Sequence, residues 1–291
     1  LLTRLEHHSN IVPWQILASE IGFTIEVVEI FPDGTLDIQD YKAKLSLSPT
    51  IVCFSHVSNT LGTINDAKLM TSLAHEVGAL VLIDGAQAAP HMNVDLQDIN
   101  CDFYVASGHK MYGPTGIGFL YGKSSLLESM PPWRGGGEMI ASVSFEEPTT
   151  FNVAPYKFEA GTPHISGAIA FASAIKWMES VGVENIASHE LALTKYAHEE
   201  LLKIEGLRIY GTAKHKAGVV SFLVEGVHPS DLATLLDQLG IAVRTGHHCT
   251  EPLMNWFKIP GTVRASFAAY TTFEDIDSLV AALERAIKML K

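Results

Sequence analysis

Cysteine and basic charge are scarce in this sequence, and long hydrophobic runs are missing. The 291 residues include three cysteines, and 20 Lys and Arg stand against 32 Asp and Glu, for a formal net charge of −12. A small, odd number of cysteines makes no disulfide framework and suits a reducing compartment, so we expect a cytoplasmic location. The acidic balance argues against nucleic acid as a partner. No apolar stretch is long enough to cross a bilayer, so we expect no membrane partner.

The composition is that of a well-packed globular protein. Apolar residues make up 47% of the chain and charged residues 18%, which excludes the low hydrophobicity of disordered proteins. Strand-like and helix-like segments alternate in the first half. We predict strands at 24–30, 51–55, 79–84 and 103–106, and helices at 10–21, 36–45 and 66–77. Continuous apolar strands separated by helices predict an α/β fold with a mainly parallel sheet.

The second half has a different texture. Residues 131–163 look irregular, exposed and loop-like, and a helix at 166–181 then leads into a smaller α+β domain. We place the boundary after residue 173, which gives a large domain of 1–173 and a C-terminal domain of 174–291. In the C-terminal domain we predict helices at 183–204, 229–239 and 273–290, and strands at 218–224 and 241–244.

The most informative segment joins the apolar strand at 103–106 to the turn Ser107-Gly108-His109-Lys110. A lysine presented at a strand end, beside small and hydrogen-bonding residues, can form a Schiff base with a carbonyl cofactor when burial or neighbouring charge lowers its pKa. Pyridoxal phosphate is the usual cofactor of such a site. Taken alone, the segment is equally consistent with an ordinary surface turn.

A second polar group follows the strand at 79–84. Asp84 ends this strand, and a carboxylate at this depth needs a cationic partner, which a pyridinium nitrogen would provide. Gln87, three residues later, is placed to bond the ring oxygen. The alternative is that Asp84 caps the next helix. In parallel sheets ligands gather at the carboxyl ends of the strands, so we expect Asp84 and Lys110 to meet at one edge.

Three motifs together resemble those of a known family. They are Ile83-Asp84-Gly85-Ala86-Gln87, the block of residues 107–116, and the segment of residues 243–249, Val-Arg-Thr-Gly-His-His-Cys. Their content and order are similar to those of SufS-type (group II) cysteine desulfurases, within the class V aminotransferases. The resemblance covers essentially the whole chain. It implies a fold-type I pyridoxal phosphate enzyme, with a mainly parallel large domain and a smaller α+β domain.

The resemblance implies roles for five residues around the cofactor ring. Lys110 would form the Schiff base and shuttle the proton. Asp84 would pair with the pyridine nitrogen, and Gln87 with the phenolic oxygen. His7 would stack on the ring face, and Asn59 would lie near the ring oxygen and the substrate carboxylate.

It also implies roles around the phosphate and the substrate. Ser107 and His109 would hold the cofactor phosphate, and Thr162 would reach the phosphate of a neighbouring subunit, which implies a homodimer. Arg264 would clamp the substrate carboxylate with help from Arg244, because a planar guanidinium bonds a carboxylate through two parallel hydrogen bonds.

Cys249 distinguishes a desulfurase from a plain aminotransferase, which needs no such thiol. A thiolate is the working nucleophile, and His247, His248 and Arg244 are placed to favour it. The resemblance implies that Lys110 removes the α-proton of L-cysteine and that Cys249 then attacks the substrate sulfur. The expected products are L-alanine and a persulfide, which passes to a sulfur-acceptor protein for iron–sulfur cluster assembly. L-selenocysteine would enter the same cycle, which leaves a selenocysteine lyase as an alternative.

Two further alternatives come from the residues. The first is a metal site built from some of His7, His8, His247, His248 and Cys249, which carry zinc-competent ligands. Adjacent histidines point in different directions on a strand and no spaced cysteine pair is present, so we expect no metal. The second is a catalytically incomplete fragment, because roughly the first quarter of a usual family member has no counterpart in this chain.

Overall fold

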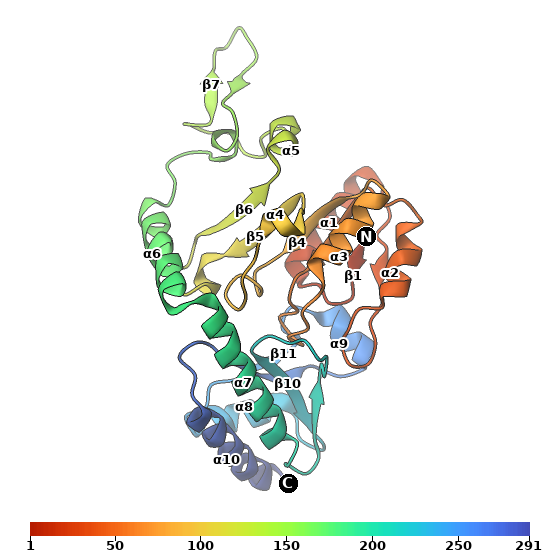
Figure 1. The fold of residues 1–291 in the computed structure, drawn as a ribbon, viewed down its shortest axis with the longest axis vertical. Coiled ribbons are helices and arrows are strands. Elements are labelled where there is room, and N and C mark those ends of the chain that lie inside the picture. The colour runs from red at the N-terminus through yellow and green to blue at the C-terminus, as the bar shows by residue number, and fades with distance from the viewer.

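The structure is a computed structural model, and it describes residues 1–291. Its larger sheet has the strand order β3-β4-β5-β6, visible in the upper half of the molecule in Figure 1. The parallel strands are β3 (Ile51–Ser55), β4 (Leu80–Asp84) and β5 (Phe103–Ser107), and β6 (Gly118–Gly122) pairs antiparallel with β5. The predicted α/β fold with a mainly parallel sheet is confirmed.

Short helices cover this sheet. They are α1 (Val12–Ile21), α2 (Ile38–Leu45), α3 (Ala67–Glu76) and α4 (Leu96–Ile99). Tyr41 of α2 and Met70 of α3 pack in one buried cluster with Phe54, Ile83 and Tyr104 of the strands. Because these side chains are removed from water, the cluster fixes the strands against the helices. None of the helices is long and apolar enough to span a membrane.

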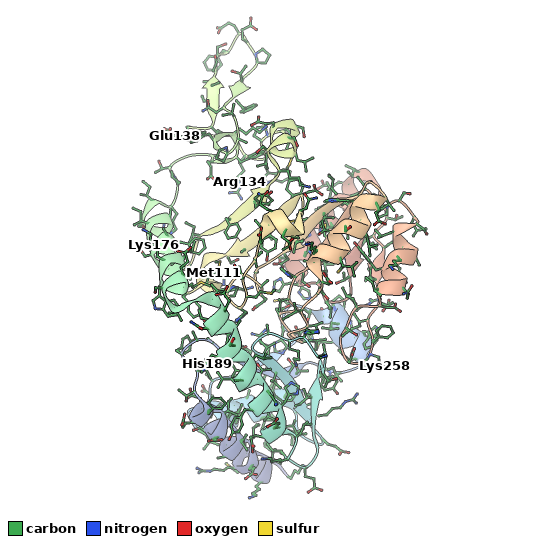
Figure 2. The ribbon with its side chains drawn as sticks, viewed as in Figure 1. Met111, Arg134, Glu138, Lys176, His189 and Lys258 are labelled. Atoms are coloured by element: carbon green, nitrogen blue, oxygen red, sulfur yellow. The ribbon has the colours of Figure 1, made fainter.

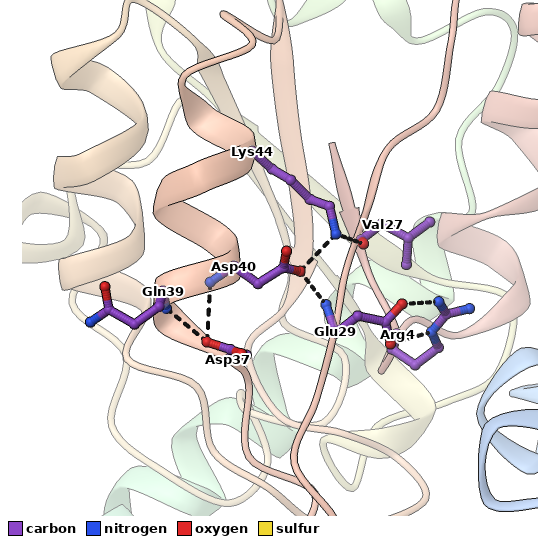
Figure 3. A network of polar contacts seen from close by, with 7 residues as sticks. All are labelled: Arg4, Val27, Glu29, Asp37, Gln39, Asp40 and Lys44. Atoms are coloured by element: carbon purple, nitrogen blue, oxygen red, sulfur yellow. Dashed lines mark hydrogen bonds and ion pairs between the residues drawn. The ribbon is translucent and has the colours of Figure 1, made fainter.

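A two-stranded parallel pair, β1 (Leu2–Thr3) and β2 (Val27–Val28), lies beside β3. Figure 3 shows the polar network that ties it to α2: Arg4 pairs with Glu29, the Glu29 amide donates to Asp40 at 2.8 Å, and Lys44 bonds Asp40 at 2.7 Å. These partly exposed ion pairs contribute little energy singly. Together they hold the strand that leads directly into residues 5–10, which border the candidate site.

The C-terminal half is built around an antiparallel sheet with the order β11-β12-β10-β9. Its strands are β9 (Leu207–Tyr210), β10 (Val219–Val224), β11 (Arg244–Gly246) and β12 (Thr262–Ser266). The helices of this half are α7 (Val183–Leu201), α8 (Pro229–Gln238), α9 (Glu251–Phe257) and α10 (Phe273–Leu290). Helices α7, α8 and α10 share a buried apolar cluster with the sheet, so the predicted α+β character is confirmed.

The long helix α6 (Ile165–Val181) lies to the left of the larger sheet in Figure 1 and leads into α7. Phe171 and Met178 of α6 pack with Ile186 of α7 and with Met111, which Figure 2 labels close to this helix. Before α6, helix α5 (Ser124–Ser129) leads to a hairpin of β7 (Ile140–Ser142) and β8 (Thr150–Phe151), which projects from the body of the molecule. The predicted domain boundary after residue 173 lies inside α6 and stays a prediction.

Two strand predictions were wrong in extent. Of residues 24–30, only Val27 and Val28 form a strand, because their partner β1 has only two residues to pair with. Of residues 241–244, only Arg244 pairs, and the strand continues to Gly246 instead. Ile241 and Val243 are apolar because they pack against the core cluster of this half, not because they belong to the sheet.

Gly85 directly follows Asp84 at the end of β4 and has no room for a side chain. An added Cβ would lie 2.0 Å from the ring of buried Tyr104. We expect Gly85→Ala to lower the free energy of unfolding by about 2 kcal/mol or more, because the overpacked ring must move. Gly135→Ala is the control, since nothing lies within 4 Å of its Cβ position. Equal denaturant midpoints for the two variants would contradict this packing.

Candidate active site

A cavity of about 370 Å³ opens at the carboxyl ends of β3, β4 and β5. Seven predicted site residues share its lining, and they come from four separate segments of the chain. They are His7, Asn59, Asp84, Gln87, Ser107, His109 and Lys110. The expected convergence of polar groups at one edge of the sheet is therefore present.

Strand register explains why these residues meet. In the parallel sheet Ser55 pairs with Asp84, and Asp84 pairs with Val105, so β3 and β4 end at the same level and β5 runs two residues further. After Ser107 the chain turns through a short 3₁₀ helix, Gly108–Lys110. This turn returns Lys110 to the cavity instead of carrying it away from the sheet.

Lys110 is half-buried, and the structure shows no hydrogen bond or ion pair for its amine. Burial lowers the pKa of Lys110 from its ordinary value, and the positive charge of Arg264 lowers it further. The nearby carboxylate of Asp84 opposes this shift. A lysine with a lowered pKa is deprotonated more often, which makes its amine a nucleophile toward carbonyl groups.

Asp84 makes one hydrogen bond, to a backbone amide two residues later in the chain. The helix-cap alternative predicted a bond of this kind. Oδ1 of Asp84 accepts from the Ala86 amide at 2.9 Å. The bond closes a turn rather than capping a helix, because no helix follows until α4 at Leu96. The carboxylate keeps its second oxygen for a group in the cavity.

His7 lies on the cavity wall at the start of a 3₁₀ helix, His8–Asn10. The Ser9 amide donates to Nδ1 of His7 at 3.1 Å, which assigns the proton of the neutral ring to Nε2. Burial lowers the pKa of His7, and the charge of Lys110 lowers it further. Both effects favour the uncharged form of the ring.

The C-terminal half contributes Arg264, which is half-buried on β12. Its Nη1 donates to the Asn59 carbonyl at 2.7 Å, while its Nε has no partner. Burial lowers the pKa of Arg264, the charge of Arg244 acts in the same direction, and Cys249 opposes the shift. A guanidinium with an unsatisfied buried N–H, next to a cavity residue, is suited to bind a carboxylate.

Cys249 lies on an exposed turn and is outside the cavity lining. It is nevertheless close enough to affect the pKa of both Lys110 and Arg264. The side chain of Asn59 donates to the His248 carbonyl at 2.7 Å, so the turn is attached to a residue of the cavity wall. The structure thus brings the predicted thiol to the border of the site.

Two predicted residues lie away from the cavity. Arg244 is exposed on β11, opposite Arg264 in the sheet register, and Thr162 is exposed in the segment before α6. Neither lines the cavity of this chain. Their roles as an assisting guanidinium and as a contact to a second subunit stay predictions.

The metal alternative finds no support in the arrangement of side chains. No three His, Cys, Asp or Glu residues gather where they could hold an ion. His248 is engaged with Thr262, whose Oγ1 lies 2.9 Å from Nε2. Nε2 of His8 accepts from the Glu251 amide at 3.0 Å.

Sequence reasoning missed Glu6. Glu6 is fully buried, accepting hydrogen bonds from the Asn10 side chain at 2.7 Å and the Ser55 amide at 3.1 Å. Burial is the main cause that raises the pKa of Glu6 to about 7, and the charge of Asp84 acts in the same direction. The only signal in the sequence was its position directly before His7.

Ser55 lines the cavity, and its buried hydroxyl has no hydrogen-bond partner in the chain. Buried polar groups are normally satisfied, so the unpaired Oγ indicates that a ligand completes the site. The cavity also presents an amine at Lys110, a carboxylate at Asp84 and hydrogen-bonding groups at Ser107 and His109. These groups fit the aldehyde, ring nitrogen and phosphate of pyridoxal phosphate.

Comparison with known proteins agrees with this chemistry. The family model for class-V aminotransferases matches residues 1–279. The chain belongs to this family. A probable cysteine desulfurase of Halalkalibacterium halodurans is 50% identical over 98% of the chain and 70% of that protein. The cysteine desulfurase of Escherichia coli (strain K12 / DH10B) is 47% identical over 100% of the chain and 71% of its own length.

Solved structures of the family have the same fold. The Escherichia coli cysteine desulfurase CsdA superimposes with a TM-score of 0.96 at 39% identity, covering 100% of the chain and 72% of the structure. The enzyme from Thermococcus onnurineus NA1 gives a TM-score of 0.95 at 39% identity, covering 99% and 72%. The predicted fold-type I architecture and the predicted family, a PLP-dependent one, are confirmed.

The raised pKa of Glu6 predicts a pH-dependent loss of stability. Between its ordinary value of 4.5 and about 7, Glu6 is ionised in the unfolded chain but still protonated in the folded one. The unfolded state then binds fewer protons, so the free energy of unfolding falls as the pH rises. Glu6→Gln removes this contribution, and its stability relative to wild type should increase by up to about 3 kcal/mol across the interval.

Chemical denaturation at a series of pH values measures this difference. Glu20→Gln, an exposed glutamate on α1, is the control and should follow the wild-type curve. A constant difference between Glu6→Gln and wild type across the interval would show that Glu6 is already ionised in the folded chain.

Proposed function

We propose that this chain is a pyridoxal phosphate-dependent cysteine desulfurase that converts L-cysteine to L-alanine and transfers the sulfur to Cys249. The observation that carries the proposal is one cavity that holds both the Lys110 amine and the Asp84 carboxylate. The family match and the relatives named cysteine desulfurase support the same activity. When bound, the cofactor supplies a protonated ring that stores the electron pair released at the α-carbon.

The residues of the cavity wall divide the binding of the cofactor between them. Lys110 would supply the amine that attaches it covalently, and Asp84 would keep the ring nitrogen protonated. Gln87 would donate to the ring oxygen, and the ring of His7 would cover one ring face. Ser107 and His109, which line the same cavity at the strand end of β5, would hold the phosphate.

Substrate binding is assigned to the arginines and Asn59. Arg264 binds the substrate carboxylate, for which its unpartnered Nε–H is available. Its bond to the Asn59 carbonyl fixes the orientation of the guanidinium. Arg244 adds positive charge from the neighbouring strand. The amine of Lys110 would remove the α-proton of the bound substrate, because its lowered pKa leaves it unprotonated more often.

The sulfur is transferred to Cys249. Its thiolate attacks the sulfur of the substrate, the substrate's carbon–sulfur bond breaks, and its electron pair returns to the carbon skeleton, which takes up protons and leaves as L-alanine. The persulfide of Cys249 then passes to an acceptor protein, and iron–sulfur cluster assembly is the use that we infer for it. The exposure of Cys249 suits a transfer between proteins.

Two finer points belong to the same proposal. A homodimer would let Thr162 reach the phosphate of the second subunit, which fits its exposed position outside the cavity of its own chain. L-Selenocysteine would enter the same cycle. Three rivals remain alternatives to test: a selenocysteine lyase, a class V aminotransferase, and a chain whose cofactor site is incomplete.

Replacing the proposed sulfur acceptor separates the desulfurase from an aminotransferase. We expect Cys249→Ser to lose persulfide formation and to release alanine from L-cysteine at least about 100-fold more slowly, because serine is a poor sulfur nucleophile. Binding of pyridoxal phosphate, followed by its visible absorbance, should stay unchanged.

Cys101→Ala is the control, because Cys101 is buried and lies outside the cavity. Mass spectrometry of the intact protein after reaction with L-cysteine detects the added sulfur. Wild-type rates of sulfur release by Cys249→Ser would contradict the assignment of the nucleophile.

A further inference from the structure

The turn that carries Cys249 has an unfavourable backbone. His248 and Cys249 are consecutive non-glycine residues with left-handed φ angles of 51° and 57°. Each such residue costs about 1–2 kcal/mol relative to ordinary backbone conformations. The turn keeps this shape only if neighbouring groups hold it, so the contacts around it decide where the thiol lies.

His8 makes two of these contacts. Its backbone N–H donates to the Cys249 carbonyl at 2.7 Å. Its ring nitrogen Nε2 accepts from the backbone N–H of Glu251, the first residue of α9, at 3.0 Å. One residue thus binds the chain at Cys249 itself and again two residues later, at the start of α9. Because Nε2 accepts, the neutral ring carries its proton on Nδ1.

His8 is also fixed to the cofactor side of the site. It follows His7, which lines the cavity, and it begins the 3₁₀ helix that ends at Asn10. The side chain of Asn10 donates to buried Glu6, which is bonded to the end of β3. Residues 6–10 therefore connect the Cys249 turn to the wall of the cavity.

We propose that His8 is a positioning residue, which holds the Cys249 turn at the distance from the cavity that sulfur transfer requires. The inference rests on the proposed role of Cys249 as sulfur acceptor. His8 does not line the cavity, and it acts through the backbone of the turn. Its ring acts by accepting the hydrogen bond from the Glu251 amide at Nε2, and it does not act as an acid or base.

Two amide substitutions test the reach of this acceptor. Glutamine has an oxygen as many bonds from the backbone as Nε2, whereas asparagine is one bond shorter and reaches only the level of Nδ1. His8→Gln should therefore keep the hydrogen bond to the Glu251 amide, and His8→Asn should lose it.

The first readout uses the cofactor-free protein and does not depend on catalysis. We expect the amides of residues 247–251 to exchange with solvent deuterium about tenfold faster in His8→Asn than in wild type, which is the effect of one lost hydrogen bond. His8→Gln should exchange at the wild-type rate. His8→Ala, which has no side-chain acceptor, should match His8→Asn and replaces it if that variant does not fold.

The second readout is the rate of persulfide formation on Cys249 in the cofactor-loaded enzyme. We expect kcat to fall about tenfold in His8→Asn with KM for L-cysteine unchanged, because Arg264 and the cavity still bind the substrate. His8→Gln should keep at least half of the wild-type rate. If the reaction required an imidazole at this position, His8→Gln would be as slow as His8→Asn.

His228 provides a matched control. Its ring nitrogen Nδ1 accepts from the Ser230 amide at 3.3 Å at the start of α8, so it has the same type of bond far from the site. His228→Leu should leave both readouts at wild-type values. Equal exchange and equal kcat in His8→Asn and His8→Gln would overturn the role of His8.

The same experiments separate this inference from the proposed function. If Cys249→Ser still releases sulfur, Cys249 is not the acceptor and the functional proposal fails. If Cys249→Ser is inactive but His8→Asn exchanges slowly and reacts at the wild-type rate, the functional proposal stands and the positioning role of His8 is wrong.

Discussion

The placement of a half-buried lysine amine and a carboxylate in one cavity is the arrangement on which the site depends. Lys110 lies in the same cavity as Asp84, and burial lowers its pKa while the charge of Asp84 limits the shift. Parallel pairing brings Asp84 level with Val105 on the strand that leads to Lys110. The chemistry of the site is thus a consequence of sheet register, because a one-residue slip would turn one of the two groups to the opposite face.

The C-terminal half completes the site through a few polar contacts. Arg264 donates to the Asn59 carbonyl, and the Asn59 side chain donates to the His248 carbonyl. The ring of His8 accepts from the Glu251 amide, at the end of the turn that carries Cys249. These bonds link the cavity wall to Arg264 and to the exposed thiol of Cys249. Each net hydrogen bond contributes about 1 kcal/mol, so the group acts by fixing geometry more than by adding stability.

The fold and the central residues of the site could be predicted because local patterns encode them. Strands at 51–55 and 79–84 are continuous apolar runs, and Asp84 and Lys110 follow strand ends, where ligands of parallel sheets gather. Glu6 could not be predicted from its type, because a glutamate is normally exposed. Its burial depends on Asn10 and Ser55, which only the folded chain brings together.

The contact between the Cys249 turn and the cavity wall was also beyond the sequence. His8 and Cys249 are far apart along the chain, and nothing in the sequence connects them. The strand at 24–30 was predicted too long for a related reason: a strand is only as long as its partner, which is two residues here.

Covalent trapping of the cofactor tests the central claim most directly. The protein is incubated with pyridoxal phosphate, reduced with borohydride, digested and mapped by mass spectrometry. Our account predicts visible absorbance before reduction and a single stable adduct, on Lys110. An adduct on another lysine, or a protein that binds no cofactor, would contradict it, and the second result would favour a chain whose site is incomplete.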